Sequence, residues 1–120
     1  MGMFSKLFGK AEKPASAAAP EHAVIVHFDY GSTNLQPIFA LERELEEAIV
    51  AARAGEYDGN EVAVSGKDGC LYMYGPDADR LFAVVKPILD ACTFTSKARI
   101  KLRYGPPKDG VRESNVQLGS

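Results

Sequence analysis

Residues 23–30 read Ala-Val-Ile-Val-His-Phe-Asp-Tyr, a run of β-branched and aromatic residues with the length of one strand. Side chains alternate between the two faces of a strand, so Val24, Val26 and Phe28 share one apolar face. The other face carries Ile25, His27 and Asp29. The stretch therefore predicts a strand with one side in a core and one mixed side.

A helix is predicted after the polar loop that follows this strand. Apolar residues recur at helical spacing from Ile38 to Ala52. Thr33 or Asn34 is suited to cap its start, and Pro37 is tolerated in a first turn. Gly55 supplies a C-terminal stop.

Asp58-Gly59-Asn60 is a turn signal, and the short alternating segment 62–65 after it predicts a strand. A reversal at 66–69 leads into a second strand over 70–74, which completes a hairpin. Gly75-Pro76-Asp77 opens a second helix, in which Pro87 predicts a kink or a break. Strict alternation over 98–104 predicts the last strand, and the tail is able to add an edge strand around 115–118.

The element order is β-α-β-β-α-β. With right-handed crossovers, this order predicts a ferredoxin-like α+β sandwich, in which a four-stranded antiparallel sheet carries both helices on one face. The residues expected on the helix-covered face of the sheet are Val24, Val26, Phe28, Val62, Val64, Leu71, Met73, Ile100 and Leu102.

The opposite sheet face combines aromatic, apolar and cationic side chains, a mixture typical of a recognition surface. Its expected members are Ile25, His27, Asp29, Ala63, Ser65, Tyr72, Tyr74, Arg99, Lys101 and Arg103. Six of them are the predicted binding residues: His27, Tyr72, Tyr74, Arg99, Lys101 and Arg103. The residues themselves leave three occupants open, namely single-stranded RNA, a second subunit and a different protein. A surface of ordinary solvated side chains is the fourth interpretation.

The composition limits the class of protein. The chain has 120 residues, of which 14 are Lys or Arg and 16 are Asp or Glu, so its formal net charge is −2. This balance excludes a polybasic binder and an acidic disordered chain. No apolar run reaches the roughly 18 residues of a membrane span, and we expect a cytoplasmic protein.

Residues 1–22 are predicted to be a flexible leader and linker, followed by a single domain over 23–118. The first ten residues place basic side chains among apolar ones, which leaves weak contact with a membrane or a partner open. Residues 11–22 are rich in Ala and Pro without hydrophobic periodicity, as in linkers.

No catalytic, metal or cofactor site is predicted. His27 and Asp29 lie two residues apart on one strand face, where they are able to form an acid–base pair, but a histidine at a sheet surface is more often a passive polar residue. The two histidines do not combine with further ligands into a metal site, and the chain has neither a Walker loop nor a GxGxxG motif.

Three strings, GEYDGNE (55–61), LYMYGPDADRLF (71–82) and LRYGPP (102–107), resemble motifs of a small, uncharacterised bacterial domain family. The resemblance covers roughly residues 23–118 and implies the ferredoxin-like fold and a bacterial source, without an established activity. The YDG after the first helix is also similar to the ribonuclease E regulator B group, whose members act by binding a protein.

The function that these observations favour is a non-enzymatic binding or regulatory module. It would use the open sheet face and the adjoining YDGNE and YGPP loops to take a protein partner or a second copy of itself. The alternatives are a small dimeric enzyme with a pocket between sheet and helices, and a single-stranded RNA binder.

Overall fold

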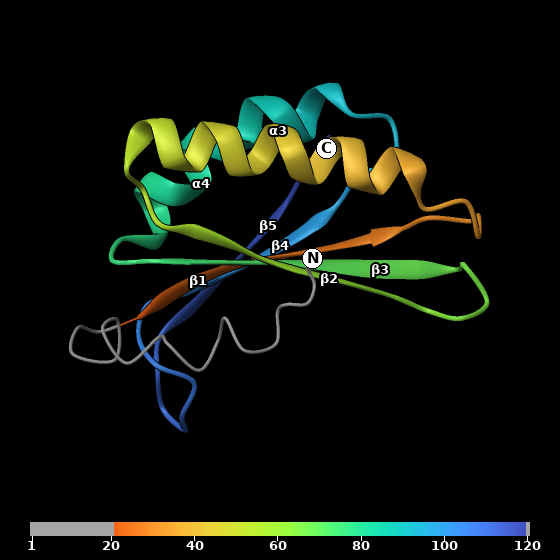
Figure 1. The fold of residues 1–120 in the computed structure, drawn as a ribbon. Coiled ribbons are helices and arrows are strands. Elements are labelled where there is room, and N and C mark those ends of the chain that lie inside the picture. Colours follow the sequence, from red (N-terminus) through yellow and green to blue (C-terminus); the bar gives the residue numbers. More distant parts are fainter. Residues whose placement is uncertain (1–20, 120) are drawn as a thin grey trace.

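A computed structural model describes residues 21–119 as one antiparallel sheet with two helices on the same side (Figure 1). The elements are β1 (His22–Asp29), α3 (Gln36–Ala52), β2 (Glu56–Val62), β3 (Asp68–Gly75), α4 (Ala78–Ala91), β4 (Arg99–Arg103) and β5 (Glu113–Gln117). Of the predicted leader and linker, residues 1–20 lie outside the described part, and His22 is already the first residue of β1.

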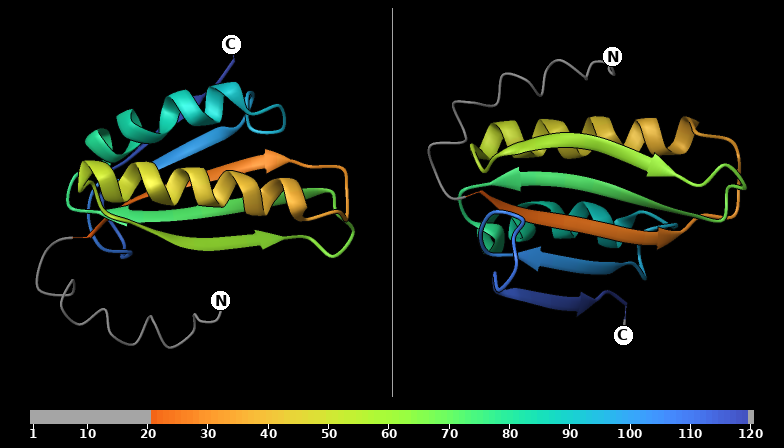
Figure 2. Two further views of the ribbon diagram at one scale, coloured as in Figure 1. Left: turned by 45° about the horizontal axis from the view of Figure 1, so that its top comes forward. Right: turned by 90° about the horizontal axis from the view of Figure 1, so that it is seen from below.

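The sheet has five strands in the order β2-β3-β1-β4-β5, as the view from below shows (Figure 2). The prediction of four strands is therefore wrong by one. The added strand, β5, pairs antiparallel with β4 along its full length, from Arg99↔Gln117 to Arg103↔Glu113. Its sequence, ESNVQ, has a single large apolar residue, so hydrophobic patterning indicates it only weakly.

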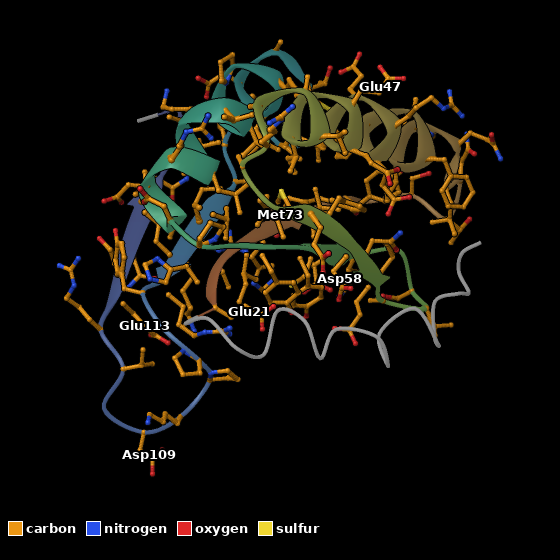
Figure 3. All side chains as sticks on the ribbon, turned by 60° about the vertical axis from the view of Figure 1, so that its left-hand side comes forward. Glu21, Glu47, Asp58, Met73, Asp109 and Glu113 are labelled. Carbon is orange, nitrogen blue, oxygen red and sulfur yellow. The ribbon has the colours of Figure 1, made fainter. Side chains whose placement is uncertain are left out.

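The core lies between the sheet and the two helices. The predicted apolar face of β1 is confirmed, because Val24, Val26 and Phe28 are all buried. Met73 of β3 points from the sheet toward the helices (Figure 3). The helices contribute buried residues at helical spacing, which are Ile38, Leu41, Leu45 and Ile49 from α3 and Ala78, Leu81, Val85 and Leu89 from α4.

Helix α3 forms where the apolar periodicity predicts it. The Asn34 side chain accepts a hydrogen bond from the Gln36 backbone N–H at 3.1 Å, although Leu35 is the N-cap residue itself. At the other end the left-handed residue is Arg53, with φ of 54°, and not Gly55. A glycine is needed at 55 for another reason, since a Cβ there would lie 2.0 Å from the backbone oxygen of Tyr74.

Strand β2 differs most from the prediction. It begins at Glu56, so Asp58-Gly59-Asn60 lies within the strand, where the register shifts at a bulge between Tyr57 and Gly59. The segment 63–65 forms the turn instead of a strand. Val64, predicted to be in the core, is therefore 99% exposed, while Val62 packs partly against the core.

Helix α4 runs without a break through Pro87 to Ala91, so the predicted break is wrong. Pro87 lies on the exposed side of the helix, where water is able to bond the carbonyl that loses its partner. The predicted start is confirmed, because the Asp77 carboxylate accepts from the backbone N–H groups of Asp79 and Arg80 at 3.1 and 3.2 Å.

Neither described helix is long and apolar enough to cross a membrane.

Candidate functional site

The open face is the side of the sheet away from the helices. The strand register places its side chains in three rows running from β2 to β5. These rows are Glu56-Tyr74-Ala23-Arg103-Glu113, Gly59-Tyr72-Ile25-Lys101-Asn115 and Glu61-Cys70-His27-Arg99-Gln117. All six predicted binding residues lie on this face. Ala63 and Ser65 belong to none of the three rows, because they follow the end of β2.

Aromatic and apolar groups occupy the middle of the open face. Ile25 on the central strand lies opposite Tyr72 of β3 and Lys101 of β4. In the row of Tyr74, Ala23 and Arg103, the Ala23 side chain is fully buried. The guanidinium carbon of Arg103 and the centre of the Tyr74 ring, on the strands to either side of Ala23, are 5.9 Å apart. Arg103 is only 9% exposed and donates to the Gly105 carbonyl at 2.8 Å, so it is a fixed part of the surface.

The two other cations of β4 have carboxylates within reach in their own chain. A nitrogen of Arg99 lies 3.7 Å from an Asp29 oxygen, and Nζ of Lys101 lies 3.9 Å from a Glu113 oxygen. Both separations are long for a salt bridge, and all four side chains are substantially exposed to solvent. The cations are thus held loosely.

Tyr72 is oriented by an acid of the edge strand. Its hydroxyl donates to Glu61 Oε1 at 2.7 Å. That hydrogen bond, followed by burial of the hydroxyl, raises the pKa of Tyr72 well above its usual range. The proton therefore stays on Tyr72 at neutral pH, and the ring presents a flat apolar surface next to a carboxylate.

An acidic hollow of about 410 Å³ lies at the end of the open face beside the β2–β3 turn. Its lining residues are His27, Glu61, Val62, Ala63, Val64, Asp68, Gly69 and Cys70. His27 Nε2 lies 3.2 Å from Asp68 Oδ2. His27 therefore pairs with Asp68 of the neighbouring strand and not, as predicted, with Asp29. Pairing of β3 with β1 brings Asp68 within reach of His27, and the Asp29 carboxylate lies beside Arg99.

The lining of the hollow is acidic. Glu61 and Asp68 supply two carboxylates, and His27 lies between them and Arg99. Burial is the main reason that the pKa of the Cys70 thiol is raised, so this sulfur is a poor nucleophile at neutral pH. Within residues 21–119, no group of three or more His, Cys, Asp or Glu side chains is arranged to hold a metal ion.

Sequence reasoning missed Glu61, Asp68 and Glu113 as members of the open face. The sequence pattern places Glu61 in the YDGNE loop and Asp68 in a reversal, and the edge strand that it allows around 115–118 begins after Glu113. The signal for all three is cross-strand pairing, because Glu61 pairs with Cys70, Asp68 with Asp29 and Glu113 with Arg103. Such pairing depends on register, which a β-bulge shifts by one residue.

Comparisons with protein-family models, with curated proteins and with solved structures each gave no match. The geometry of the open face is therefore the basis on which a function is assigned.

Proposed function

We propose that this chain is a non-enzymatic, cytoplasmic binding module of ferredoxin-like arrangement, extended by β5, whose open face docks a protein partner. The element order and the β2-β3-β1-β4 part of the sheet support the arrangement. The observation that carries the function is the layout of the open face, with Tyr72, Tyr74 and Ile25 in the middle and charged residues around them. Aromatic and arginine side chains are enriched at the centres of protein interfaces.

The charge balance of the open face favours a protein over a nucleic acid. The open face has three cations, all on β4. The open face and its end beside the β2–β3 turn also carry five carboxylates, which belong to Asp29, Glu56, Glu61, Asp68 and Glu113. Phosphate binding requires an excess of positive charge. A protein surface with charges of both signs is the better complement.

The hollow does not support the alternative of an enzyme with a pocket between sheet and helices. It lies on the open face, and the raised pKa of Cys70 leaves its one thiol protonated. The His27–Asp68 pair by itself is a polar contact with both side chains about half exposed, 44% and 49%. Surface pairs of this kind are common without catalysis.

The test is photo-crosslinking in cells that express the chain naturally. A photoreactive phenylalanine analogue at Asn115, which is exposed on the open face, leaves the six predicted contact residues intact. The same analogue at Glu47, on the outer side of α3, is the matched control (Figure 3). We expect protein adducts from position 115 that disappear with Tyr72→Ala and Lys101→Glu.

Two results would overturn this function. Equal adducts from positions 115 and 47 would show that the open face is not a selective surface. Adducts from position 115 that ribonuclease removes would identify RNA as the occupant.

A further inference from the structure

We infer that the partner on the open face is a second copy of this chain, packed face to face so that Arg99 of each copy enters the acidic hollow of the other. This inference rests on the proposed function and names its partner. It follows from the charge pattern along the rows of the sheet, from the position of the hollow and from the area of the open face.

Two aligned ways exist to pack the open face against itself about a twofold axis. An axis across the strands places each strand over its own copy, so β4 lies on β4 and Lys101 faces Lys101. An axis along β1 places β4 of one copy over β3 of the other, and β1 over β1. Like charges in contact are destabilising, and a cation over a tyrosine ring is stabilising. The charge pattern therefore selects the axis along β1.

The selected axis gives each row a complementary partner. The register puts Tyr74 in the row of Arg103, Tyr72 in the row of Lys101, and Cys70 in the row of Arg99. In the dimer, Lys101 of the second copy therefore lies over Tyr72, and Ile25, His27 and Asp29 of β1 each lie over their own copy at the axis. Like charges meet in two kinds of contact, Glu56 over Glu113 at the outermost corners and Asp29 over its own copy at the end of β1, and both lie at exposed edges of the interface where water screens them.

Arg99 is the residue that fits the hollow. In the row that it shares with Cys70, the twofold axis carries Arg99 of the second copy over Cys70, which lines the hollow together with Glu61 and Asp68. A guanidinium has five N–H donors and is the cation best suited to bridge two carboxylates. The sequence thus supplies both halves of the contact from one chain, as an isologous interface requires.

The Arg99 side chain is available for this contact. It is 49% exposed, and its nearest acid in the chain, Asp29, is 3.7 Å away and 84% exposed. A solvated pair of that length contributes little to stability, so exchanging it for a partly enclosed carboxylate pair costs little.

The area of the open face predicts a weak dimer. Five strands spaced about 4.8 Å apart, each five to eight residues long at about 3.3 Å per residue, give roughly 500 Å² in projection on each copy. Two copies together bury about 1,000 Å², the low end for a specific interface. We expect a dissociation constant in the micromolar range.

The experiment uses charge reversal and mixing on the full chain. Sedimentation equilibrium from about 1 μM to about 1 mM follows association from 13.0 kDa to twice that mass. Arg99→Glu alone and Glu61→Arg alone each place like charges at the hollow, and we expect each to raise the dissociation constant by at least about 30-fold. A mixture of the two variants restores one native and one reversed pair, so it dimerises again.

Glu47→Arg is the control for the size of the charge change, since Glu47 lies on the outer side of α3 (Figure 3). It leaves the dissociation constant unchanged. Recovery of the dimer in the mixture also shows that both variants are folded, because an unfolded variant is unable to restore association.

Three outcomes overturn the inference. They are a monomer at every concentration, a dimer that survives Arg99→Glu, and a mixture that stays monomeric when each variant alone is monomeric. A monomeric chain that still gives adducts with a different protein from Asn115 contradicts the self-association alone. A chain that gives no selective adduct at all contradicts the proposed function as well.

Discussion

Glu42 of α3 connects the helix layer to the bulged part of β2 and provides the sharpest test of the fold. Its Oε2 accepts from the Tyr57 hydroxyl at 2.6 Å and from the Asn60 amide nitrogen at 2.7 Å. Burial, followed by the Glu42 hydrogen bond, raises the pKa of Tyr57 far above its usual range. The Tyr57 hydroxyl is partly buried, so water replaces a lost acceptor only in part.

The substitution Glu42→Ala removes an ionised acceptor from two donors. Each hydrogen bond to a charged group contributes about 1.5–3 kcal/mol, and the Asn60 amide recovers part of its share from water. We therefore expect the free energy of unfolding to fall by about 2–4 kcal/mol. For a domain of this size, that loss lowers Tm by roughly 10–25 °C.

Urea unfolding followed by circular dichroism measures this loss, with Glu47→Ala as the control. Glu47 lies exposed on the same helix, so its replacement changes the unfolding free energy by no more than about 0.5 kcal/mol. A double-mutant cycle with Tyr57→Phe should give a coupling energy above about 1 kcal/mol. A coupling near zero, or equal losses for positions 42 and 47, refutes the assignment of the Tyr57–Glu42 hydrogen bond.

Three further changes have outcomes that follow from single contacts. Gly55→Ala places a Cβ 2.0 Å from a backbone oxygen and should prevent stable folding. Gly110→Ala is the control, because position 110 has open space and only a positive φ; it should lower the free energy of unfolding by about 1 kcal/mol in thermal unfolding. Asp77→Ala removes the α4 N-cap and should cost about 1 kcal/mol in urea. The raised pKa of Tyr72 means that its contribution to stability is complete below pH 10.0 and is lost as pH rises through the folded-state pKa. Absorbance titration should show that Glu61→Gln moves that loss to lower pH, and an unchanged curve would contradict the Tyr72–Glu61 hydrogen bond.

The sequence predicts those elements whose pattern is local. The alternation in β1 and the helical spacing in α3 each report burial directly, because a side chain's face follows from its position in the element. The start of α4 follows in the same way from Asp77, whose side chain bonds the backbone two and three residues on. These features need no knowledge of the rest of the chain.

The features that were mispredicted depend on contacts between distant residues. Asp58-Gly59-Asn60 has the composition of a turn, yet it lies in β2 because Asn60 and Tyr57 bond Glu42, at least 15 residues away in sequence. The same shift moves Val64 out of the core and into a turn. The partner of His27 also lies 41 residues away, at Asp68, and no local pattern indicates it.

The open face also explains why an interface of mixed charge suits this chain better than a purely apolar one. The two exposed cations of β4, Arg99 and Lys101, each have a loosely held acid within reach, and Arg103 is nearly buried, so the unpartnered monomer exposes few uncompensated charges. Association then exchanges weak, solvated pairs for better enclosed ones instead of burying isolated charge, which is the costly alternative. Specificity follows from the order of charges along the rows, since a partner with the same charges in another order would place cations on cations. A self-complementary order is therefore more informative about the partner than the formal net charge of −2.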